Sequence, residues 1–218
     1  ANMLYLLAGV LGFLVLGIFY GSQILIHKYL VKDSKVAEAF SPLIASLVPT
    51  VFVLMWKQDW SLHLDKLLIP EYWGIILLTE AIVCVLVIAF IDRKFEITTG
   101  KELFLMCVEA GAMEIPQRLM MQNFICLLLG AWGMDARLGI PINGLVFCAG
   151  IFAQALIVKE RNHFRLIIEM LASFTFSLGA GYVYYFSGCL IYCIAAHMAE
   201  RFITVKYAIK KAAKSSSQ

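Results

Sequence analysis

Long apolar stretches separated by short polar ones recur along the whole chain. A helix needs about 20 apolar residues to cross the hydrocarbon core of a membrane. The pattern predicts seven spans: Met3–Ile26, Val36–Trp56, Gly74–Ile91, a long central element from Leu103, Ile142–Val158, Leu166–Phe186 and a last span from Cys189. We therefore expect an all-α fold, a polytopic membrane bundle of about seven transmembrane helices.

The composition supports this class of protein. The chain has 218 residues, of which 61% are hydrophobic and 15% are charged, whereas ordinary soluble domains carry roughly 25% charged residues. Residues 1–218 are expected to form a single integral membrane domain in a lipid bilayer. The six cysteines all lie in apolar segments without a CxxC pair or a Cys/His cluster, so no metal or other cofactor is expected.

The charges of the loops predict the orientation. Thirteen basic residues follow the odd-numbered spans: Lys28, Lys32, Lys35, Arg93, Lys94, Lys101, Lys159, Arg161, Arg165, Lys206, Lys210, Lys211 and Lys214. Only three, Lys57, Lys66 and Arg137, lie outside the spans on the opposite side. Because basic loops stay in the cytoplasm, the C-terminus is predicted to be cytoplasmic, with the plasma membrane as the expected location. The net charge of +3 reports this orientation and not nucleic-acid binding.

Ionisable residues interrupt the central element, Leu103–Asn123. Glu109, Glu114 and Arg118 stand there among apolar residues, although a charge in a membrane span costs roughly 2.5–3.5 kcal/mol on insertion scales. Glu114 and Arg118 are four residues apart, so a helix places them within ion-pair reach, and Gln122 continues the same face. Pro116 lies between the charges and should kink the helix. The pair is either a structural link within a bundle or part of a polar site inside the membrane.

Two segments resemble one known family. Ala112–Arg118 (AMEIPQR) resembles the Glu-Glu-x-x-x-Arg motif of the CAAX prenyl endopeptidase and bacteriocin-processing superfamily, also called the Abi family. Leu178–His197 (LGAGYVYYFSGCLIYCIAAH) is similar to the closing pattern of that family, a glycine-rich helix, aromatic residues, a tight Ser-Gly turn and a helix bearing a histidine. The family-like core spans about 74–208. The resemblance implies a metal-independent intramembrane endopeptidase that acts on membrane-associated peptides, with a glutamate and a histidine activating water.

The motifs match only in part. The residues that fit them are Glu114, Arg118 and His197. Three residues depart: Met113 replaces the first glutamate, Arg201 replaces the asparagine that follows the histidine, and Gln154 is the polar residue nearest to the missing Phe-x-x-x-His motif. A methionine cannot take a proton and a glutamine cannot act as a base, so the resemblance leaves enzymatic activity open.

Three functions stay open at this point. The chain is a peptidase with a rearranged site, using Glu114 or Glu109 with His197, or an inactive relative that serves as a binding, regulatory or bacteriocin-immunity protein. A small transporter or channel component ranks last, because no inverted repeat is evident. We expect Glu114 and His197 to face one cavity, with Met113 and Gln154 in its wall. Two further acids, Glu80 and Glu169, are expected to pair with Arg118 or with a loop cation, and a proton-relay role is the alternative for either.

Overall fold

A computed structural model describes residues 39–91, 99–157 and 159–215, together with scattered positions between 10 and 26. The elements in these ranges are helical and include no strand, which confirms the all-α class. Most positions of the first predicted span, Met3–Ile26, lie outside the described residues.

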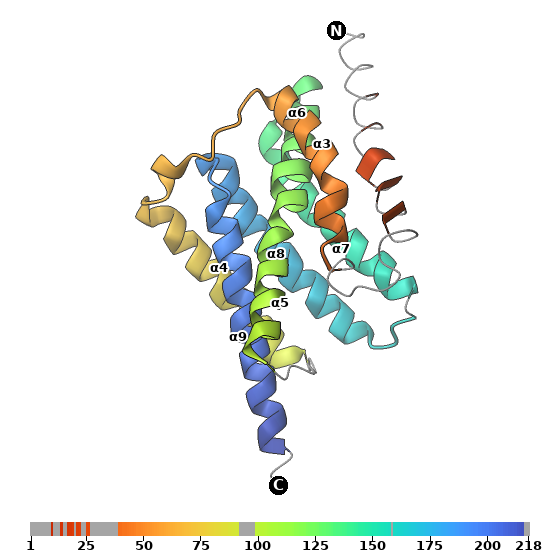
Figure 1. Ribbon diagram of the computed structural model, residues 1–218, viewed down its shortest axis with the longest axis vertical. Coiled ribbons are helices and arrows are strands. Elements are labelled where there is room, and N and C mark those ends of the chain that lie inside the picture. Colours follow the sequence, from red (N-terminus) through yellow and green to blue (C-terminus); the bar gives the residue numbers. More distant parts are fainter. Residues whose placement is uncertain are drawn as a thin grey trace. The chain divides into compact units, whose positions relative to one another are not determined.

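Figure 1 shows the order of the helices along the chain. The α-helices are α3 (Ser41–Lys57), α4 (Pro70–Phe90), α5 (Gly100–Ala112), α6 (Asn123–Ala131), α7 (Gly139–Ile157), α8 (His163–Ser187) and α9 (Ile191–Ser215). Two short 3₁₀ turns, η1 (Leu64–Lys66) and η3 (Ala136–Leu138), precede α4 and α7. A π-helical turn, η2 (Ile115–Gln122), joins α5 to α6.

Three described helical segments are long and apolar enough to cross a membrane: Pro70–Phe90, Ala136–Leu156 and His163–Ser187. They correspond to the third, fifth and sixth predicted spans. The second predicted span forms the apolar helix α3, which has only 17 residues. The last predicted span is a 25-residue helix, α9, whose first half already carries Glu200 and Arg201, with Lys206 shortly after them. The count of seven spans therefore stays a prediction.

The chain divides into two compact units, which are described separately. One contains 1–62 and 112–143, and the other contains 63–111 and 144–218. That the whole chain forms one integral domain stays a prediction.

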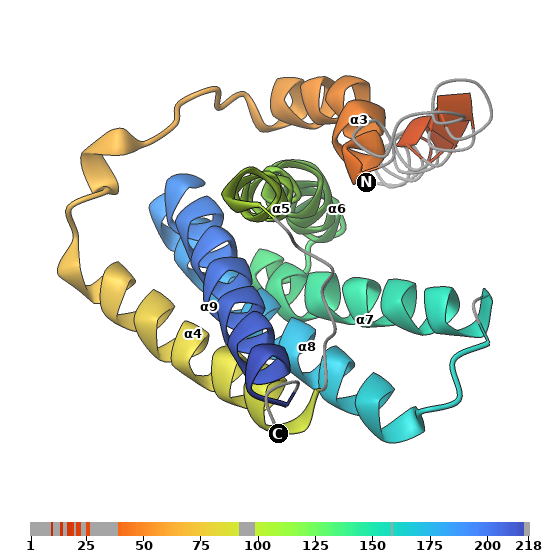
Figure 2. The same ribbon diagram turned by 60° about the horizontal axis from the view of Figure 1, so that its bottom comes forward.

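In the second unit, α4 packs against α8 and α9 (Figure 2). Gly179 on α8 allows a close approach, because a Cβ atom at that position would lie 2.6 Å from Thr79 Cγ2 on α4. Helix α8 ends where Gly188 adopts a φ of 71°, and the Cys189 N–H donates a hydrogen bond of 3.0 Å to Ser187 Oγ. This confirms the tight Ser-Gly turn, since glycine reaches a left-handed conformation without steric cost.

Tyr192 ties the beginning of α9 to the segment that precedes α4. Its hydroxyl donates a hydrogen bond of 2.6 Å to the Lys66 carbonyl, although the two residues are 126 positions apart. The Tyr192 ring packs on Trp73, with 4.8 Å between ring centroids, and on Tyr72. The Trp73 indole N–H in turn donates a hydrogen bond to the Leu67 carbonyl. This aromatic cluster fixes the segment that precedes α4 against the beginnings of α4 and α9.

Tyr192→Phe should lower the unfolding temperature by about 2–4 °C. The variant keeps the ring and loses the hydroxyl that donates to the Lys66 and Ile69 carbonyls, a shared hydrogen bond worth about 1 kcal/mol. Thermal unfolding in detergent, followed by circular dichroism, measures the shift. Tyr182→Phe is the control, because Tyr182 lies exposed on α8 and its variant should unfold as the wild type does. Equal shifts in both variants would contradict the role of Tyr192.

In the first unit, α3 packs against η2 and α6, with the Trp56 and Phe124 rings 6.4 Å apart. Helix α6 ends at Ala131, and the Asp135 carboxylate then caps η3. Arg137 donates hydrogen bonds to this exposed carboxylate and lowers the pKa of Asp135. The central element therefore ends before Gly139.

Candidate functional site

At Pro116, where the sequence predicts a kink, the helix changes from α-helical to π-helical hydrogen bonding. Helix α5 ends at Ala112, and Ile115–Gln122 is π-helical, with Pro116 in its first turn. The Asn123 N–H donates to the Arg118 carbonyl, five residues earlier. Proline has no N–H, and its ring clashes with the carbonyl four residues before it. The α-helical ladder therefore cannot continue through Pro116, and the wider turn accommodates the break.

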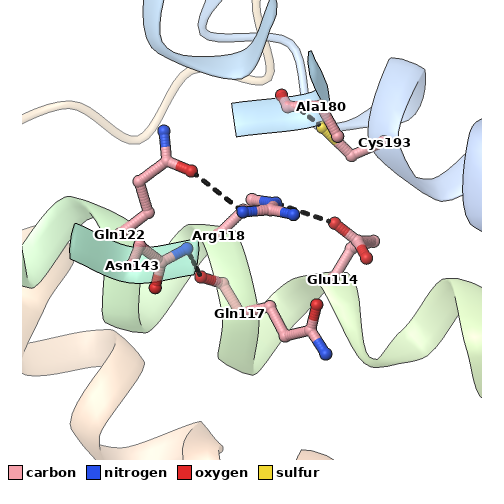
Figure 3. A network of polar contacts seen from close by, with 7 residues as sticks. All are labelled: Glu114, Gln117, Arg118, Gln122, Asn143, Ala180 and Cys193. Carbon is pink, nitrogen blue, oxygen red and sulfur yellow. Dashed lines mark hydrogen bonds and ion pairs between the residues drawn. The ribbon is translucent and has the colours of Figure 1, made fainter. Parts of the chain in front are cut away.

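The two central charges form the predicted buried ion pair. Glu114 and Arg118 are both 0% exposed, and Arg118 Nε donates to Glu114 Oε2 over 3.1 Å. Arg118 Nη1 donates to Gln122 Oε1 over 3.3 Å, so the three side chains form one line along the helix (Figure 3). The spacing of four residues thus gives the contact that the sequence predicts.

Two asparagines add to this polar network. Asn143, fully buried on α7, donates from Nδ2 to the Gln117 carbonyl over 3.3 Å (Figure 3). Asn123 donates to the Leu119 carbonyl over 3.0 Å. Sequence reasoning missed Asn143, whose only signal was an amide side chain at the beginning of an apolar span. Its contact holds the first turn of α7 against the π-helical turn.

The other candidate residues lie in different surroundings. Met113 is half-buried beside the ion pair in sequence. In the second unit, His197 is half-buried on α9, with its ring 4.9 Å from the ring of Phe176. Arg201 lies on the same helix with its Nε 3.9 Å from Glu200 Oε2. Gln154 is exposed on α7.

Three further acids, Glu80, Glu109 and Glu169, lie in the second unit. Glu109 is half-buried on α5, and Glu80 is buried on α4. Glu169 pairs over 3.1 Å with Arg165, a cation that the sequence predicts in a loop and that lies in the first turn of α8. Glu114 belongs to the first unit and His197 to the second, and a cavity shared by both stays a prediction.

Within the described ranges, no group of three His, Cys, Asp or Glu residues could hold a metal ion. None of the six cysteines forms a disulfide, and all except Cys126 are buried. Cys193 Sγ, for example, donates to the Ala180 carbonyl over 3.2 Å (Figure 3). They behave as small core residues.

In the described ranges, fold and site together define an all-helical protein with three helices suited to a membrane and a buried Glu–Arg–Gln line that begins just before a π-helical turn. No family model, curated protein or solved structure matches this chain. The resemblance to the CAAX endopeptidase superfamily therefore rests on the residues of its two motifs.

Proposed function

We propose that this chain is a catalytically inactive relative of the CAAX endopeptidases, an integral membrane protein that binds a membrane-associated peptide or protein without cleaving it. The observation that carries this proposal is the 3.1 Å ion pair between Glu114 and Arg118, both fully buried. This ion pair engages Glu114, the acid of the motif that would otherwise be the first candidate for a general base.

A general base must reach a water molecule within hydrogen-bonding distance and accept its proton. The Glu114 carboxylate accepts a hydrogen bond from the Arg118 guanidinium, so one of its oxygens is already engaged by a cation. Met113, at the position of the activating glutamate in the family, has no proton-accepting group. The arrangement therefore favours a structural pair next to a binding surface over a hydrolytic centre.

The π-helical turn supports a functional role for this segment. Single π-helical turns are rare and occur frequently at functional sites, and here the turn carries Arg118 and directly follows Glu114. In the proposed setting the chain spans the plasma membrane seven times with its C-terminus in the cytoplasm, as the basic loops predict.

Reconstitution in liposomes with a panel of fluorogenic membrane-anchored peptides tests the absence of cleavage. The wild-type chain should release no more product than liposomes without protein. Enzyme-like cleavage that is lost in Glu114→Gln and His197→Ala, but kept in the exposed control Glu71→Gln, would overturn the proposal. Cleavage lost only in Glu109→Gln would overturn it in favour of a displaced carboxylate.

The same peptides test binding. Fluorescence anisotropy in nanodiscs should reveal saturable binding of at least one peptide, weakened by Met113→Trp beside the ion pair. Met134→Trp is the matched control, because Met134 lies exposed after α6. If no peptide binds saturably, or if both tryptophan variants bind as the wild type does, the binding function assigned to this segment is wrong.

A further inference from the structure

Helices α5 and α9, both in the second unit, form an apolar groove of about 360 Å³. Its wall includes Leu103, Phe104, Cys107, Met198, Ala199 and Phe202. The volume lies within the range of small-molecule sites, roughly 300–1,000 Å³. None of these side chains carries a charge or a hydrogen-bonding group stronger than a thiol, so the groove suits a hydrocarbon ligand.

Helices α5 and α9 run beside each other (Figure 1) and share a buried cluster next to the groove. At Gly111 a Cβ atom would lie 2.9 Å from Met198 Cγ, and Leu103, Cys107 and Val205 form a buried cluster. Two other residues of the wall, Phe104 and Phe202, point outward, since they are 63% and 49% exposed. The close contact holds the helices, and the two aromatic rings extend the groove to the surface.

Positive charge gathers at one end of this groove. The Lys206 ammonium lies 5.8 Å from the centroid of the Phe202 ring, which forms part of the wall. Lys101 is exposed next to Gly100, where α5 begins, and Lys210 is exposed one turn beyond Lys206. The nearby acid Glu102 accepts a hydrogen bond from the Thr99 N–H and so caps α5. An elongated ligand in the groove would thus meet hydrocarbon along its length and cations at its end.

We propose that this groove binds an anionic phospholipid, with one acyl chain against the apolar wall and the phosphate at Lys206 and Lys101. The proposal rests on the proposed function in one respect, the membrane setting that places these lysines at the cytoplasmic leaflet. Anionic lipids of that leaflet attract basic residues next to membrane helices. A free phosphate ion would leave the apolar wall unused, and a zwitterionic lipid would gain no net attraction from the lysines.

Native mass spectrometry of the purified full chain, titrated with dioleoyl phosphatidylglycerol or dioleoyl phosphatidylcholine, tests this assignment. The wild type should retain phosphatidylglycerol more tightly. Lys206→Gln should weaken phosphatidylglycerol binding about fivefold and leave phosphatidylcholine unchanged. Ala199→Trp, which fills the groove, should weaken both lipids about tenfold or more.

Two matched controls keep the comparison specific. Lys159→Gln removes an exposed lysine outside the groove, and Leu77→Trp adds a ring at an exposed position on α4; both should bind as the wild type does. Phe104→Ala removes part of the wall without overfilling it, so it should weaken binding even if Ala199→Trp fails to fold. Equal retention of the two lipids by the wild type, or wild-type binding by Phe104→Ala, would overturn the proposal.

The lipid readout is independent of the peptide experiments. A chain that neither cleaves nor retains phosphatidylglycerol preferentially would defeat the lipid site alone. A chain that retains this lipid and also cleaves peptides would defeat the inactive-relative proposal alone.

Discussion

Arg118→Met should lower the free energy of unfolding by about 3–5 kcal/mol, because it leaves the fully buried Glu114 carboxylate without its guanidinium. Methionine has nearly the length of the arginine stem, so lost packing contributes little. Titration with a denaturing detergent in mixed micelles, followed by circular dichroism, measures the change.

The surface pair of Arg165 and Glu169 is the matched control. It has the same spacing of four residues and the same distance of 3.1 Å, but its side chains are 40% and 26% exposed. Arg165→Met should therefore cost only about 0–1 kcal/mol. The double variant Glu114→Leu with Arg118→Met should recover most of the stability, because no buried charge remains. Equal costs for Arg118→Met and Arg165→Met would refute the argument from burial.

Gly179→Leu should have the second-largest effect, a loss of about 3 kcal/mol at the upper end of overpacking costs. A Cβ atom alone would lie 2.6 Å from Thr79 Cγ2 and 2.8 Å from Thr79 Cβ. Thr79 is β-branched, so its χ1 has little freedom to yield, and its hydroxyl donates to the Ile75 carbonyl over 2.8 Å. Helices α4 and α8 would have to separate. The same detergent titration measures this loss.

Gly150→Leu on α7 separates crowding from the loss of a glycine. A Cβ atom at Gly150 meets no atom within 4 Å, so this variant should be neutral or more stable by up to about 1 kcal/mol, the usual helix-propensity gain over glycine. If both leucine variants unfold alike, the close approach at Gly179 is not a determinant of stability.

Local interactions explain what the sequence alone determined. The helical class and the three long apolar helices follow from runs of apolar residues, because a helix satisfies its backbone hydrogen bonds within one segment. The Glu114–Arg118 contact follows from a spacing of four residues, and the turn at Gly188 follows from the conformational freedom of glycine. Each of these features depends on residues close together in the chain.

Only the tertiary structure decided which distant residues meet. Asn143 contacts the Gln117 carbonyl 26 positions away, and Tyr192 contacts the Lys66 carbonyl 126 positions away. The sequence predicted that Pro116 breaks the helix, but only the structure showed that the break is a π-helical turn and not a bend. The pairing of Gly179 with Thr79 likewise has no sequence signal. A residue's spacing shows which face of its helix it occupies, but the helix that covers this face is selected by packing across the whole chain.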